Sequence, residues 1–321
     1  MISPRAIRLL LRHFDAIDQV VSRRMTRKRP WAEEALTGLL CDLLDAETQE
    51  EEKVSYTLQQ LHEDLAQSDE PISIRLRIDS HQYPKHLERW VTQSDFGFIV
   101  NYQDQFESSH STRLAWLLQA KRVFPEKDGT YDVNSSFKSI DAEQHARMKA
   151  LRDWAGEEFI RYFLYCPRPK ELGPYVREEL NQRRINALSD NIFDYTLGLE
   201  LRDDILSATP TTAAGMFVGS LDNTPKTLGE THSEIFSHSI PFAWFIVHHL
   251  AVGRSIPGNP RDRGKNIGPR HLDIERLVRG DHRVLEGFPL PESLNENQPP
   301  RILPAHTIEI SVVCGTDRPR N

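Results

Sequence analysis

The sequence predicts an α/β protein with a mixed sheet, and three patterns support this class. Three N-terminal helices are expected where apolar residues recur at helical spacing, over residues 6–21, 31–44 and 54–65. Residues 72–78 alternate between apolar and polar side chains, which is typical of a strand with one buried face. Two apolar runs rich in branched and aromatic residues, 95–102 and 114–121, flank a polar loop and indicate two adjacent strands.

The elements that follow extend this pattern. Residues 139–155 form a predicted helix that Gly156 would end, and residues 159–165 form a buried strand that stops before Pro167. The order up to this point is therefore helix, three strands, helix, strand. Weaker patterns in the second half predict helices and strands over residues 175–188, 215–220, 241–252 and 307–313.

These elements divide the chain into three expected segments. Residues 1–28 hold an amphipathic helix and a basic run, and residues 29–169 hold the core just described. Residues 170–321 form a C-terminal α+β region of unknown role. The sequence leaves open whether this region folds separately or is continuous with the core.

Composition narrows the classes of protein to consider. With 321 residues, 38% of them hydrophobic and 27% charged, the chain can bury a core of ordinary size. No apolar run reaches the ~20 residues that span a bilayer, and the first residues lack the apolar segment of a secretory signal. The three cysteines are far apart, which fits buried thiols in a reducing compartment. We therefore expect a cytoplasmic protein without membrane contact, and the sequence has no phosphate-binding glycine loop and no nucleophile elbow.

Basic residues are concentrated in two strips, although the net charge is −7. One strip is residues 23–29, and the other extends from Arg254 to Arg283. A protein that holds a phosphate backbone needs such local positive charge. We favour residues 254–270 of the second strip as the clamp, with Arg261, Arg263 and Lys265 at its centre, because prolines and glycines permit movement there. Residues 23–29 take this role if that loop faces away from the substrate.

Asp95, Gln119 and Lys121 are the residues that we expect to carry chemistry. Hydrolysis of a phosphodiester needs a divalent cation held by oxygen ligands, and a nearby lysine can stabilise the developing charge. Gln119 and Lys121 are two positions apart on one strand and therefore face the same side. A turn centred near residue 108 would set Asp95 opposite Lys121 and Gly97 opposite Gln119. The simpler alternative is an ion pair between Asp95 and Lys121 at a solvated strand edge.

The segments Ser94-Asp95-Phe-Gly-Phe-Ile-Val and Leu117-Leu-Gln119-Ala-Lys121 resemble the PD-(D/E)xK nuclease superfamily. The resemblance is to the variant with glutamine two residues before the lysine, as in Mrr-like restriction enzymes and several bacterial defence nucleases. Two features depart from the pattern, because no proline precedes Asp95 and Gln119 is a neutral ligand.

The resemblance covers about residues 31–166 and implies a restriction-endonuclease-like αβββαβ core with a mixed central sheet. It implies cleavage of nucleic acid, DNA rather than RNA, with Mg²⁺ or Mn²⁺ as the cofactor and defence against phage as the role. Asp95 would bind the metal, Gln119 would complete its ligands, and Lys121 would orient water and stabilise charge.

In such variants a glutamate on the helix before the sheet supplies the missing charge, and Glu33 and Glu34 are the candidates. Glu33 lies in angle with the buried leucine stripe of its helix, whereas Glu34 points away, so Glu33 is the preferred ligand. Glu34 stays open because helix ends can be misassigned by one position. Gln144 shares a stripe with Met148 and would reach the phosphate or a water, and Glu88 is an alternative ligand. The simpler alternatives are structural. Glu33 would stabilise the first turn of its helix, where an acidic side chain suits the helix dipole, and Gln144 would be a hydrogen-bonded amide in the core.

Two other functions are compatible with the sequence. The first is an inactive nuclease fold that binds nucleic acid or protein. The second is a small-molecule metal hydrolase based on histidines of the C-terminal half, although His232 and His238 lack a standard ligand spacing and the adjacent His248 and His249 cannot share a helix face. Nucleic acid is the expected partner, and a homodimer or a partner defence protein is left open.

Overall fold

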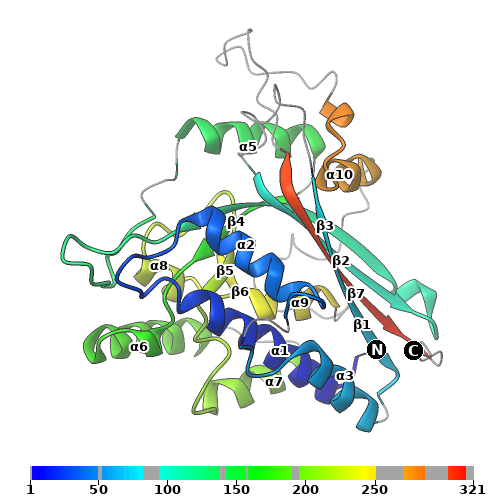
Figure 1. Ribbon diagram of the computed structural model, residues 1–321, viewed down its shortest axis with the longest axis horizontal. Helices are drawn as coiled ribbons and strands as arrows, with labels where there is room; N and C mark the ends of the chain where they lie inside the picture. Colours follow the sequence, from blue (N-terminus) through cyan, green and yellow to red (C-terminus); the bar gives the residue numbers. More distant parts are fainter. Residues whose placement is uncertain are drawn as a thin grey trace.

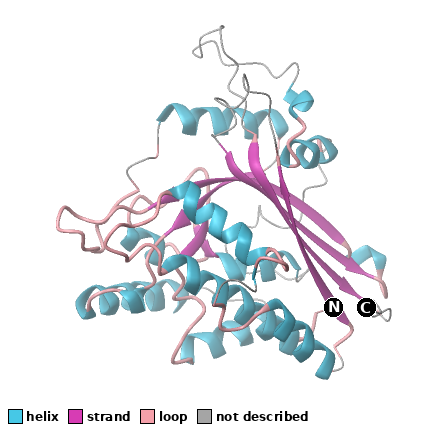
Figure 2. Ribbon diagram, viewed as in Figure 1, coloured by secondary structure: helices cyan, strands magenta, loops and turns pink. Residues whose placement is uncertain are grey.

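A mixed seven-stranded sheet with helices on both faces organises the protein (Figures 1 and 2). The computed structural model describes residues 2–49, 53–68, 70–81, 94–137, 140, 142–156, 158–189, 195–250, 270–285 and 303–315. The strands are β1 (Ile72–Ser80), β2 (Ser94–Asp104), β3 (Thr112–Arg122), β4 (Ile160–Tyr165), β5 (Met216–Gly219), β6 (Ser239–Pro241) and β7 (Pro304–Cys314). Their order across the sheet is β1-β7-β2-β3-β4-β5-β6. The predicted α/β class is confirmed.

Nine α-helices lie within the described ranges, and side chains fix where several of them begin. They are α1 (Pro4–Ser22), α2 (Glu33–Leu44), α3 (Leu58–Gln67), α5 (Ala142–Ala155), α6 (Pro174–Ser189), α7 (Tyr195–Leu206), α8 (Leu228–Ser233), α9 (Phe242–Leu250) and α10 (His271–Val278). Short 3₁₀ turns are η2 (Ser108–His110), η3 (Pro169–Glu171) and η5 (His282–Leu285). The Ser3 hydroxyl caps α1, and Thr57 with Gln60 forms a capping box at α3. None of the described helices is both long and apolar enough to cross a bilayer.

The last strand, β7, lies between two strands that are consecutive in the sequence. It pairs antiparallel with β1 and parallel with β2, so β1 and β2 are not neighbours. β2 pairs antiparallel with β3, and β4 returns parallel to β3 after the crossover helix α5. Residues 170–321 thus contribute three strands, β5, β6 and β7, to the sheet that the core strands form.

The two faces of the sheet are covered differently. Phe96 and Phe98 of β2 point to the face that carries α9, where Phe98 contacts Phe242 at 5.5 Å between ring centroids. Gly97 points to the opposite face, where a β-carbon would lie only 2.3 Å from the Val278 carbonyl oxygen of α10. Glycine is therefore required at position 97, because α10 packs directly on the backbone of the strand.

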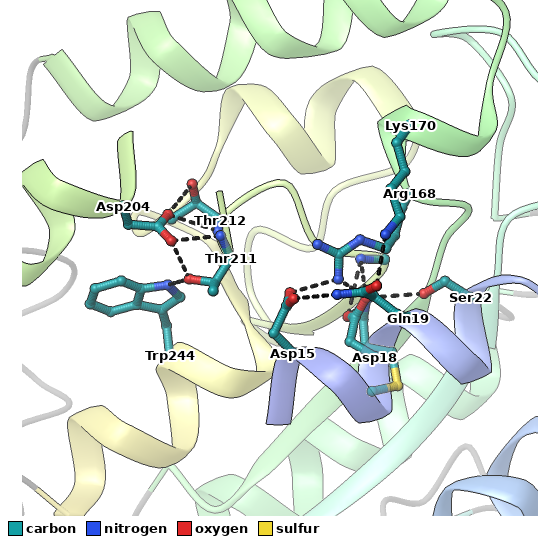
Figure 3. Close-up of polar contacts among 12 residues, drawn as sticks. Asp15, Asp18, Gln19, Ser22, Arg168, Lys170, Asp204, Thr211, Thr212 and Trp244 are labelled. Carbon is teal, nitrogen blue, oxygen red and sulfur yellow. Dashed lines mark hydrogen bonds and ion pairs between the residues drawn. The ribbon is translucent and has the colours of Figure 1, made fainter. Parts of the chain in front are cut away.

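Helix α1 is fastened to the sheet by a buried charge cluster (Figure 3). The Arg168 Nη1 atom, just after β4, donates to Asp15 Oδ1 at 2.6 Å and to Asp18 Oδ1 at 2.8 Å. Asp18 also accepts the backbone N–H groups of Gly215 and Met216, at the start of β5. The cluster therefore joins α1, β4 and β5, and each of its charges has an opposite charge or a backbone donor beside it.

Candidate active site

Gln119 and Lys121 point to the face of β3 that α5 covers. Gln119 is 3% exposed and Lys121 is 5% exposed, so both polar side chains are buried in the sheet. In the parallel ladder with β4 their partners are Tyr162 and Leu164. The intervening Ala120 pairs with Phe163, whose ring packs against α9 on the other face. The two residues therefore share one face, as their spacing predicts.

Helix α5 brings two polar side chains to this face. Gln144 Nε2 donates to Gln119 Oε1 at 3.0 Å, so the predicted inward orientation of Gln144 agrees with the structure. The next residue, His145, has its Nδ1 atom 3.1 Å from the Tyr162 hydroxyl, and the two rings are stacked. Burial and the neighbouring Lys149 lower the pKa of His145 below its ordinary value.

His145 and Tyr162 were not singled out by the sequence analysis. The sequence did hold a clue to both residues. His145 directly follows Gln144, and Tyr162 carries a hydroxyl within the apolar strand β4. Only the pairing of β3 with β4, in which Tyr162 lies beside Gln119, shows that His145 and Tyr162 adjoin the candidate site.

Glu33 reaches β3 from the opposite face of the sheet. It is the first residue of α2, and its Oε1 atom accepts the backbone N–H of Arg122 at 2.9 Å. The N–H groups of Leu117 and Val123 bond toward β4, so the N–H of Arg122 points to the β2 side of β3. Glu33 therefore lies beside the backbone of Lys121, whereas Glu34 is exposed to solvent.

Lys121 is a buried cation whose ammonium group has no hydrogen bond or ion pair with any residue that the structure describes. A lysine whose side chain is almost fully buried within an apolar strand is retained where its charge has a use. Asp95 lies in β2, but its side chain is outside the described residues.

The predicted register between the two strands is wrong by two residues. β2 and β3 are adjacent and antiparallel, as predicted, but Gly97 pairs with Leu117 and not with Gln119. The same register sets the backbone of Asp95 beside Gln119 instead of Lys121. Asp104 explains the difference, because its Oδ1 atom accepts the backbone N–H groups of Phe106 and Glu107 in the loop. The turn is therefore centred one residue earlier than the predicted centre near residue 108. A shift of two residues leaves each residue on its original face.

Several other sequence predictions fall outside the described residues. These are Glu88, most of the favoured loop 254–270, and its central cations Arg261, Arg263 and Lys265. The four histidines of the alternative hydrolase are described and do not gather. His232 contacts Phe217, while His249 packs on Trp116 at 4.6 Å between ring centroids. In the described part of the chain no three His, Cys, Asp or Glu side chains form a metal-binding group.

The donor chemistry around β3 suits a hard divalent cation. Gln119 offers an amide oxygen on the α5 face, and neither histidine nor cysteine adjoins it on its strand. The Glu33 carboxylate lies at the opposite face, so the structure does not bring these two predicted ligands together. Oxygen ligands fit Mg²⁺ or Mn²⁺ better than Zn²⁺, and a carboxylate such as that of Asp95 would be needed beside Gln119. Neither a protein-family model nor a solved structure matches the chain, so the function has to be inferred from these residues themselves.

Proposed function

We propose that this protein is a metal-dependent nuclease that hydrolyses phosphodiester bonds, with DNA as its substrate. The observation that carries the proposal is the burial of Lys121 without a described partner, two residues from Gln119 on one strand face. A lysine in this position can stabilise the charge that develops on a phosphate in the transition state. Gln144 bonds to Gln119 from the α5 face, and Glu33 bonds to the backbone of the same strand from the opposite face.

Each residue has a role in this proposal. Asp95 would hold Mg²⁺ or Mn²⁺ and Gln119 would add its amide oxygen, whereas Glu33, at the opposite face of the sheet, would hold the backbone of β3 beside Lys121. When bound, the cation polarises the phosphate and lowers the pKa of a coordinated water. Gln144 is a positioning residue, because its hydrogen bond fixes the direction of the Gln119 amide. Lys121 would orient the attacking water and stabilise charge on the phosphate.

The arrangement of elements supports a restriction-endonuclease-like core. Three strands, a crossover helix and a parallel fourth strand follow α2 and α3 in the expected order. The insertion of β7 between β1 and β2 departs from a simple αβββαβ sheet. The sequence resemblance to defence nucleases extends the proposal to the destruction of phage DNA.

An inactive binding module is the second candidate, and one observation favours it. The position two residues before Lys121 carries a neutral Gln119 whose amide is already hydrogen bonded to Gln144. A protein of this kind would bind nucleic acid but would not cleave it.

The test is cleavage of supercoiled plasmid, single-stranded DNA and RNA by the purified protein in Mg²⁺, Mn²⁺ or EDTA. We expect cleavage of DNA in either metal and none in EDTA. Cleavage that persists in EDTA would contradict a metal-dependent mechanism. Binding of all three substrates without cleavage in either metal would select the inactive module.

A further inference from the structure

We propose that Arg27, Lys28 and Arg29, in the segment between α1 and α2, bind the phosphate backbone of the nucleic acid that reaches the candidate site. This inference rests on the proposed function and names the surface that holds its substrate. The strip to which they belong, residues 23–29, has five cations and no acidic residue. Dense positive charge on a protein of net charge −7 marks a surface for a polyanion.

The three cations are exposed and have no carboxylate partner among the residues that the structure describes. Arg23, at the start of the strip, differs because its guanidinium lies 3.7 Å from Glu171. Cations that are not neutralised by the protein can release the counterions of a nucleic acid when they contact its phosphates.

Contacts of Met25 and Trp31 hold the segment in place. Met25 is fully buried, and its carbonyl oxygen accepts the Tyr131 hydroxyl at 3.1 Å. The guanidinium groups of Arg24 and Arg27 lie 4.9 and 5.6 Å from the ring centroid of Trp31. These contacts reduce the freedom that the cations would lose on binding, so the surface is partly organised beforehand.

The strip is also close to the candidate site along the chain. Arg29 precedes Glu33 by four residues. At ~3.6 Å per extended residue, the Cα atoms of Arg29 and Glu33 are at most about 14 Å apart. One DNA strand carries a charge every ~3.4 Å, so about four nucleotides span the distance from Arg29 to Glu33, whose carboxylate bonds the backbone of β3.

A nucleic acid fits this surface better than a membrane does. Binding in a lipid interface needs apolar side chains that insert beside the basic ones. None of the exposed large hydrophobic residues that the structure describes lies in the strip, and the Trp31 ring is faced by arginines. Aromatic rings and arginines together are typical of surfaces that contact nucleic acids.

The test is a salt titration of DNA binding by the triple variant Arg27→Gln/Lys28→Gln/Arg29→Gln. A labelled 30-base-pair duplex is followed by fluorescence anisotropy in EDTA, so binding is read without cleavage. The slope of log K against log salt is negative, and each lost phosphate contact reduces its magnitude by ~0.9. We therefore expect the magnitude to decrease by up to about 2.7 in the triple variant. The matched control is Arg5→Gln/Arg75→Gln/Arg202→Gln, which changes the net charge equally at exposed arginines elsewhere and should leave the slope unchanged.

The outcomes separate this inference from the proposed function. Failure of the wild-type protein to bind the duplex, an unchanged slope for the triple variant, or an equal decrease for the control would overturn the inference. Binding to phosphatidylserine vesicles in place of the duplex would overturn it as well. Cleavage with an unchanged slope would remove only the surface, whereas a reduced slope without cleavage in any metal would remove only the nuclease activity.

Discussion

Two buried side chains with basic groups lie at or just beyond the ends of the neighbouring strands β3 and β4, and their surroundings differ sharply. Arg168, just beyond β4, is 3% exposed and bonds to Asp15 and Asp18 (Figure 3). Lys121, at the end of the neighbouring strand β3, is 5% exposed and has no hydrogen bond or ion pair to a described residue. The two side chains are therefore buried to nearly the same extent, and they differ in whether a described carboxylate lies beside them.

This comparison separates a structural charge from a functional candidate. The Arg168 cluster joins three elements and pairs its charges with one another, so it has little capacity for a charged ligand. Lys121 has no ion pair of this kind with a described residue, so its buried position does not serve the stability of the fold. A role in acting on a substrate would explain why a lysine stands there. The environment of each cation, and not its residue type, distinguishes the two.

The largest expected effect on stability comes from Arg168→Met. The substitution leaves Asp15 and Asp18 buried without their cation, so the free energy of unfolding should fall by about 3–5 kcal/mol. The matched substitution Lys121→Met removes a buried charge that has no described partner, so it should leave stability unchanged or raise it. Urea unfolding of both variants measures the difference in the free energy of unfolding. Equal destabilisation would contradict the distinction between a paired Arg168 and a Lys121 without a described partner.

The next effect concerns pH and the surroundings of Arg168. Burial, with Arg184 and Arg168 nearby, lowers the pKa of His232 to about 3. Below pH ~6.5 the unfolded chain binds a proton at this histidine and the folded protein does not, so stability falls as the pH falls. Between pH 7 and pH 5 we expect a loss of about 2 kcal/mol from this group, at ~1.4 kcal/mol per pH unit.

The substitution His232→Leu should remove that part of the pH dependence. Unfolding of the variant and the wild-type protein at pH 7 and pH 5 measures it. The partly exposed His238 provides the control, because His238→Leu should retain the loss. An unchanged pH dependence in His232→Leu would show that His232 is protonated in the folded protein.

The smallest expected effect on stability comes from Gln144→Ala, which removes the hydrogen bond to Gln119. A single hydrogen bond of this type contributes about 1 kcal/mol. The exposed Gln182, which donates to Asn186 on α6, provides a control, since Gln182→Ala should change stability by a few tenths of this value. Only Gln144→Ala should also slow DNA cleavage. Equal cleavage by both variants would place Gln144 in a purely structural role.

The elements that the sequence predicted well are those with strong local periodicity. Helices α1 and α2 and strands β2 and β3 lie within a few residues of their expected ranges, because spacing alone reveals their buried faces. α7, α8, β6 and α10 were not predicted. Three of them have fewer than nine residues, and their burial depends on neighbours that are distant in the sequence.

Long-range pairing explains the remaining differences. The sequence predicted a last strand at residues 307–313, but its position between β1 and β2 is set by contacts across more than 200 residues. The register of β2 and β3 depends on how Asp104 bonds the loop, which spacing does not reveal. The inward positions of Gln119, Lys121 and Gln144 were nevertheless predicted, because a polar side chain in an apolar run or stripe is visible in the sequence itself.

The central claim is that Lys121 is buried for catalysis, and its most direct test is DNA cleavage by Lys121→Met. The measurement is the initial rate of plasmid cleavage in Mg²⁺ and Mn²⁺, with circular dichroism and urea unfolding to verify the fold. The exposed Lys170→Met is the control. We expect a folded Lys121→Met protein whose rate falls by about 10²–10³-fold, the usual effect of losing one group that stabilises transition-state charge, and a Lys170→Met protein that cleaves normally. Cleavage at the wild-type rate by folded Lys121→Met would contradict the claim.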